Sequence, residues 1–114
     1  QVSGHAALIA DRDQFIAASG GYKSAVGKSI SRALEEKLDR RESFLATKGE
    51  RSFISILEEG DGEYIHEAIS VIICEGDVIG AVLLLDDDAK NKMGEVEKKL
   101  ILSASAFLGR QMQA

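Results

Sequence analysis

Proline is absent from this sequence of 114 residues, and cysteine occurs once, at Cys74. Without proline there is no sign of a proline-rich linker, so the eleven glycines must form most of the sharp turns. A single cysteine excludes an internal disulfide framework. No apolar run approaches the ~20 residues that a membrane-spanning helix needs. We therefore expect a cytoplasmic protein with no membrane segment.

Clusters of basic residues are also scarce. The net charge is −5, and the adjacent Arg40 and Arg41 are flanked by acidic residues. Binding to a phosphate backbone requires a concentrated positive surface, so this segment is not predicted to bind DNA by itself. Its length suits one domain. Because it starts at Gln1 without a basic leader or a long apolar run, we expect it to be a piece of a longer chain.

Residues 71–85 form the most informative segment, in which two nearly unbroken apolar runs are separated by Gly76 and Asp77. A Gly-Asp pair in this position predicts a two-residue β-hairpin. Both alternating sets of side chains are apolar, so both faces of the hairpin should be covered. The hairpin is therefore predicted to lie at the centre of a sheet.

Shorter patterns predict the elements around this hairpin. Ser31 is a candidate N-cap for a helix that ends near residue 42, and a turn at 11–13 separates two short strands. The other predicted elements are strands at 5–10, 14–18, 43–46 and 52–57, and a short helical turn at 22–26.

From Gly94 onward the apolar residues have helical spacing and fall into two adjoining groups. Together the groups span about 160° of the helix, beyond the ~100° that packs one helix on a sheet. The first group is Met93, Val96, Leu100, Ala104 and Phe107, and the second is Ile101, Leu108 and Met112. We predict a homo-oligomer, a dimer or a tetramer, with the second group as the candidate interface. The alternative is that N-terminal residues of the same chain cover the apolar helix surface that the sheet leaves exposed.

Six motifs occur in a characteristic order: HAALIADRD at 5–13, IAASG at 16–20, KSIS at 28–31, EGDVIGAV at 75–82, MGEVE at 93–97 and FLGRQM at 107–112. In order and spacing they resemble the C-terminal GAF domain of the stage V sporulation protein T (SpoVT) family of AbrB-type transcriptional regulators. The resemblance covers almost the whole chain. It implies an α+β GAF fold, with a central, mostly antiparallel sheet of five to six strands. Helices would pack on one face, and loops plus a short helix on the other.

The same resemblance implies the domain organisation and the function. Residues 1–114 would be a single GAF-like regulatory domain, and an AbrB-type DNA-binding domain would lie upstream and carry all contact with DNA. The implied role is to couple a small-molecule signal to DNA binding in a sporulation transcription factor. The alternative is a degenerate, ligand-free GAF domain that serves only as a dimer or tetramer scaffold. The sequence does not name an effector or separate these two functions.

A candidate ligand site consists of Ser19, Tyr22, Arg51 and Phe53. In GAF domains that bind effectors, the ligand lies between the sheet and the elements inserted before the central hairpin, which places these residues near its rim. Tyr22 would stack or hydrogen-bond, and Arg51 would pair with an anion. The alternative is that Tyr22 and Arg51 simply cover a small core.

Residues suited to catalysis or metal binding do not combine into a site. Cys74 lies within an apolar strand, where a thiol is inert. Residues 86–88 are acidic but lack the spacing and the turn glycine of a calcium loop. His66 has only His5 as a companion, so no metal set is recognised. We predict a protein that is not an enzyme and has no cofactor and no metal.

Overall fold

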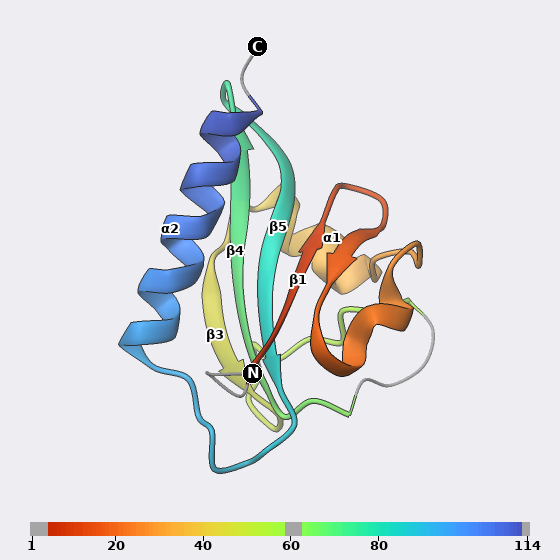
Figure 1. The fold of residues 1–114 in the computed structure, drawn as a ribbon, viewed down its shortest axis with the longest axis vertical. Helices are drawn as coiled ribbons and strands as arrows, with labels where there is room; N and C mark the ends of the chain where they lie inside the picture. Colours follow the sequence, from red (N-terminus) through yellow and green to blue (C-terminus); the bar gives the residue numbers. More distant parts are fainter. Residues whose placement is uncertain (1–4, 59–62, 113–114) are drawn as a thin grey trace.

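A five-stranded antiparallel sheet lies at the centre of the computed structural model, which describes residues 5–58 and 63–112. Its strand order is β2-β1-β5-β4-β3. The strands are β1 (Ala6–Ala10), β2 (Phe15–Ala18), β3 (Phe44–Thr47), β4 (His66–Cys74) and β5 (Asp77–Asp86). The helices are the 3₁₀ helix η1 (Gly20–Ala25), α1 (Arg32–Asp39) and α2 (Glu95–Gln111). Helix α2 covers one face of the sheet, and α1 and η1 lie on the other (Figure 1). The predicted α+β fold is confirmed.

The predicted central hairpin is formed by β4 and β5, but its turn lies one residue earlier than expected. The two turn residues are Glu75 and Gly76, whose φ angles are 52° and 87°, and Cys74 pairs with Asp77. Two successive positive φ angles are the signature of a type I′ turn, which matches the twist of the strands. Gly76 occupies the second turn position without steric cost, and Glu75 accepts a left-handed conformation.

Both faces of this hairpin are covered, as its apolar pattern predicts. Nearly every residue of β4 and of the second half of β5 is buried. On the side of α1, the core includes Phe15, Leu34, Leu38, Ile56, Ile69 and Leu83. On the side of α2, it includes Ala68, Ile72, Leu84, Met93 and Ile101. The sheet therefore separates two cores.

Helix α1 begins at the predicted cap and ends earlier than predicted. Ser31 Oγ accepts a hydrogen bond from the backbone N–H of Leu34 at 3.0 Å, which satisfies a donor at the helix start. The helix ends at Asp39 rather than near residue 42. Arg41 has a φ of 58°, and its N–H donates to the carbonyl of Leu38 at 3.0 Å. A left-handed residue after the last turn ends a helix in this way.

The predicted strand at 52–57 is wrong. The segment makes one isolated bridge, between Leu57 and Ile30. Its backbone N–H groups donate instead to side chains, from Ile54 to Glu67 Oε1 at 2.8 Å and from Ile56 to the hydroxyl of Tyr64 at 2.9 Å. Buried backbone groups need partners, and these side chains replace a neighbouring strand.

Candidate functional site

The outer side of α2 carries an exposed apolar stripe. Val96 is 75% exposed, Leu100 54% and Phe107 53%. Their spacings of four and seven residues place them on one side of a helix. Scattered apolar residues are common on protein surfaces, whereas an aligned set is a candidate contact surface. We refer to Val96, Leu100 and Phe107 as the α2 stripe.

The residues predicted to form the oligomer interface lie on another side of the helix. Ile101 is 2% exposed and belongs to the core between α2 and the sheet, and Leu108 is half-buried against the same core. Met112 is 54% exposed. Both apolar groups contribute to that core, because Met93 of the first group is buried in it and Ala104 packs against it. That Ile101, Leu108 and Met112 join copies of the chain stays a prediction.

Small residues determine how α2 is rotated on the sheet. A Cβ atom on Gly109 would lie 2.2 Å from the carbonyl oxygen of Ile73, so only glycine permits this approach. Four residues earlier, Ser105 Oγ lies 2.7 Å from Ser70 Oγ on β4. With these contacts facing the sheet, the α2 stripe faces outward.

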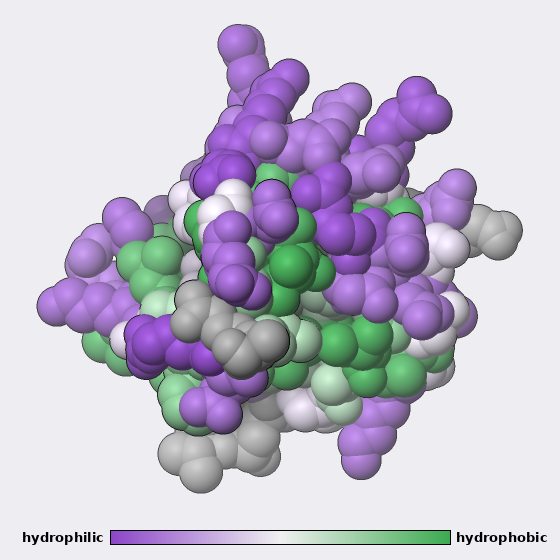
Figure 2. All heavy atoms as spheres, turned by 90° about the horizontal axis from the view of Figure 1, so that it is seen from above, coloured by the Kyte–Doolittle hydropathy of each residue, from purple (hydrophilic) through white to green (hydrophobic). Residues whose placement is uncertain are grey.

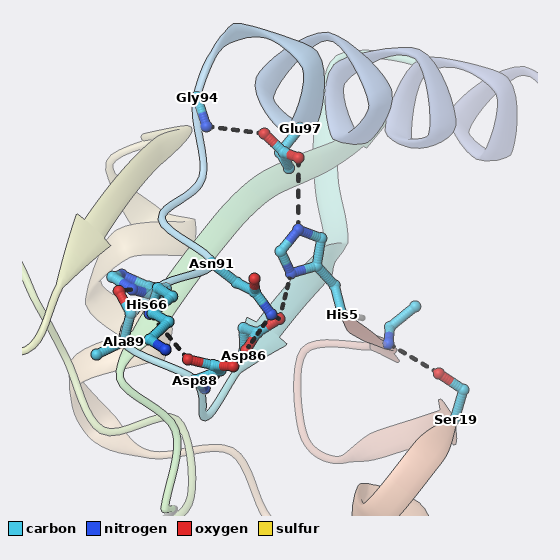
Figure 3. A network of polar contacts seen from close by, with 11 residues as sticks. His5, Ser19, His66, Asp86, Asp88, Ala89, Asn91, Gly94 and Glu97 are labelled. Carbon is cyan, nitrogen blue, oxygen red and sulfur yellow. Dashed lines mark hydrogen bonds and ion pairs between the residues drawn. The ribbon is translucent and has the colours of Figure 1, made fainter. Parts of the chain in front are cut away.

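The start of α2 is joined to the sheet through His5 (Figure 3). His5 Nδ1 lies 2.7 Å from Asp86 Oδ2, and Nε2 lies 3.4 Å from Glu97 Oε2. Both His5 and Asp86 are buried. Glu97 Oε1 also accepts from the N–H of Gly94 at 2.8 Å. That hydrogen bond first, then the backbone N–H of Glu97 itself and then His5, hold the pKa of Glu97 below its ordinary value. We call His5, Asp86 and Glu97 the His5 clasp.

The other histidine, His66, has protein partners at both nitrogens of its ring. His66 Nε2 donates to the carbonyl of Ala89 at 3.0 Å (Figure 3). Its Nδ1 lies 2.9 Å from Thr47 Oγ1. Both ring nitrogens are therefore occupied. Within residues 5–58 and 63–112, no group of histidine, cysteine, aspartate and glutamate side chains is arranged to hold a metal ion.

Of the four predicted ligand-site residues, the structure brings Tyr22 and Phe53 to one aromatic ring, and Ser19 and Arg51 have other surroundings. Tyr22 and Phe53 both contact the ring of Tyr64, with centroid distances of 6.5 Å and 5.4 Å. Ser19 Oγ accepts from the backbone N–H of Ala7 at 2.8 Å (Figure 3), and Arg51 is exposed in a turn. The aromatic rings pack against the core on the α1 side. Ligand binding by these residues stays a prediction.

Glu67 is the buried polar residue that the sequence interpretation missed. It lies on β4, fully buried, with Oε1 bonded to the N–H of Ile54. No described residue hydrogen-bonds to Oε2. Burial raises the pKa of Glu67 to about 8, so the carboxyl group is largely protonated at neutral pH. The sequence feature that could have predicted its burial is its position directly before the apolar run at 68–74.

A family model described as "Stage V sporulation protein T C-terminal, transcription factor" matches residues 1–113. The chain belongs to this family. It is 39% identical over 111 residues to stage V sporulation protein T of Bacillus subtilis (strain 168). That alignment covers 96% of this chain and 60% of the relative, so the chain spans less than two thirds of the relative's length.

The resemblance predicted from the six motifs is thereby confirmed. The family is one of transcription factors, so the chain is a transcription-factor domain and not an enzyme. Among the helices of the described residues, none is both long and apolar enough to cross a membrane.

Proposed function

We propose that this chain is the regulatory and assembly domain of a cytoplasmic sporulation transcription factor, and that α2 joins it to further copies. DNA binding would belong to an AbrB-type domain upstream in the same protein. The family supports the first part of this proposal, and the α2 stripe carries the second. Full burial of a valine, leucine or phenylalanine side chain contributes about 1.5–3 kcal/mol. Three such side chains can stabilise a helix-to-helix contact.

A second apolar surface near the end of α2 supports the same assembly. A hollow of about 110 Å³ is bordered by Ile9, Ile16, Ile72, Ile79, Leu108 and Met112. Leu108 and Met112, two of the predicted interface residues, thus extend apolar surface from the helix toward the sheet. Figure 2 views this end of the molecule, where apolar surface lies between hydrophilic side chains. A partner helix beside α2 would cover part of both surfaces.

For the opposite face of the sheet, the packing favours the scaffold over the sensor. Tyr22 and Phe53 pack against the ring of Tyr64, on the face where the resemblance places the ligand of effector-binding GAF domains. We therefore propose that this face stabilises the domain, and that regulation acts through assembly on the α2 side.

The test is the mass of the protein in solution. Light scattering after size-exclusion chromatography should give an oligomer for the wild type and a monomer for Leu100→Lys, because a buried, unpaired ammonium is costly. Leu102→Lys is the matched control, since Leu102 is 41% exposed on the same helix but on another side. A wild-type monomer at high protein concentration, or equal disruption by both variants, would contradict the proposal.

A further inference from the structure

A groove runs between α2 and the outer edge of β4, on the other side of the helix from the His5 clasp. Strand β3 pairs with β4 only as far as Ile69, so the rest of β4 has no strand beside it on that edge. The groove has a volume of about 480 Å³. Its walls include Val71 and Ile73 from β4 and Leu102 from α2. It is therefore a half-apolar hollow beside an uncovered strand.

The charged side chains that border this groove are both arginines, Arg41 and Arg110. This is unusual for a chain with a net charge of −5. Nearby cations are neutralised, since Lys37 and Arg40 both lie within 4.0 Å of Glu42 carboxylate oxygens. Within the described ranges, by contrast, no ion pair involves Arg41 or Arg110. The groove therefore has uncompensated positive charge at its rim.

Arg41 is held at the rim by the backbone. Its left-handed conformation turns the chain after α1, and its guanidinium donates to the carbonyl of Gly76 in the β4–β5 turn. A guanidinium has five N–H donors, so this contact leaves several for a ligand. Arg110 comes from the last turn of α2, so the two cations belong to separate elements.

Three serines form the polar side of the groove. Ser105 donates to the carbonyl of Leu102, so Ser70 must donate its proton to Ser105 at 2.7 Å. Ser43 in turn donates to Ser70 over 3.4 Å, a long and weak bond. The hydroxyl of Ser43 is thus the one that can turn toward a ligand at small cost.

We propose that this groove binds a small organic anion, with its carboxylate or phosphate between Arg41 and Arg110 and its apolar body against Val71, Ile73 and Leu102. Guanidinium groups bind carboxylates and phosphates through paired, charge-assisted hydrogen bonds. The apolar walls select anions that carry a hydrocarbon body over inorganic ions. This site is separate from the α2 stripe and from Ser19, Tyr22, Arg51 and Phe53, and it does not depend on the proposed assembly.

The experiment is an amide NMR titration of the protein with benzoate and with phenyl phosphate. Benzamide, the neutral analogue of benzoate, and inorganic phosphate are the matched probes. Shifts should concentrate at residues 70–73 and 102–110 with the two aromatic anions and should be far smaller with the matched probes. Arg110→Gln should weaken binding about tenfold or more, and Arg41→Gln similarly, whereas Arg40→Gln should leave it unchanged.

The amide spectrum also reports whether each variant is folded, and Arg110→Gln does not alter the turn that Arg41 supports. Binding of only one aromatic anion would support the proposal and identify the head group as carboxylate or phosphate. Equal shifts with benzamide, shifts centred elsewhere, or unchanged binding in folded Arg110→Gln would overturn it. Light scattering on the same samples gives the mass of the protein in solution. It therefore tests the assembly proposal independently of anion binding.

Discussion

At the scale of single residues, Glu67 is the least expected feature of this domain. An ionised carboxylate is costly to bury without full hydrogen bonding, and only one oxygen of Glu67 has a partner among the described residues. If the Glu67 carboxyl group keeps its proton, the cost of burying a charge does not arise. The side chain can therefore still accept from Ile54 and hold the 52–57 segment against the sheet.

The raised pKa makes stability depend on pH. The pKa of Glu67 is about 8 when folded, against an ordinary value of 4.5. At Glu67 the folded state thus binds more protons between these values, so the stability that this residue contributes is fully present below pH 4.5 and is lost as the pH rises to about 8. The slope should approach about 1.4 kcal/mol per pH unit.

The variant Glu67→Gln should remove this part of the slope, because an amide keeps the acceptor oxygen and does not ionise. Urea unfolding from about pH 5 to about pH 9 would measure the difference from wild type. Glu35→Gln, at an exposed position on α1, is the control and should leave the slope unchanged. A wild type and a Glu67→Gln variant with parallel profiles would show that Glu67 is ionised in the folded state.

Gly109 is a residue at which two effects oppose each other. Alanine stabilises a helix interior by about 1 kcal/mol relative to glycine. Its Cβ, however, would lie 2.2 Å from the backbone oxygen of Ile73, which cannot move aside as a flexible side chain can. Gly109→Ala should therefore destabilise the domain by about 1–3 kcal/mol, measured by thermal unfolding. Gly21→Ala, where nothing lies within 4 Å of the added carbon, should have little effect.

At the scale of elements, the His5 clasp links three parts of the fold. His5 precedes β1, Asp86 ends β5, and Glu97 lies in the first turn of α2. A carboxylate at a helix N-terminus is favoured by the helix dipole. The clasp therefore joins the start of the first strand to the helix that carries the proposed assembly surface.

Removing the histidine should loosen all three elements. His5→Ala removes the ring nitrogen that lies 2.7 Å from Oδ2 of the buried Asp86, and loss of one hydrogen-bonding partner of a buried group typically costs about 1–3 kcal/mol. The control is Arg12→Ala, because Arg12 pairs with Asp39 at the surface and such pairs contribute about 1 kcal/mol or less. Urea unfolding would compare them, and hydrogen exchange should be faster in the first turn of α2 in His5→Ala. Equal losses in both variants would mean that the clasp adds no stability beyond a surface pair.

At the scale of the whole molecule, the sheet separates two faces that differ in their packing and in their exposed surface. The α1 side is filled by a continuous core in which Tyr22 and Phe53 pack around Tyr64. The α2 side presents the α2 stripe, the apolar hollow and the arginine groove. Both proposals concern this second face.

The two proposed surfaces lie on different sides of α2, and this makes them separable. Leu100→Lys should abolish assembly but leave benzoate binding intact, and Arg110→Gln should do the reverse. If an anion also changed the mass of the wild-type protein in solution, the two surfaces would be coupled through α2. Such coupling would have to act equally in both directions.

Local patterns in the sequence were sufficient for much of the architecture. The apolar runs on both sides of Gly76 predict the central hairpin, and Ser31 predicts the start of α1. The helical spacing after Gly94 predicts α2, and the six motifs predict the family. These features depend on residues close together in the chain, so hydrophobic period, capping and turn preferences determine them.

Tertiary contacts decided the remainder. Which side of α2 meets the sheet depends on the fit of Gly109 against Ile73, and the 52–57 segment is no strand because Glu67 and Tyr64 bind its backbone. The groove exists because β3 stops at the level of Ile69 while Arg41 and Arg110 approach from separate elements. Each of these joins residues far apart in the chain, and local periodicity carries no information about such contacts.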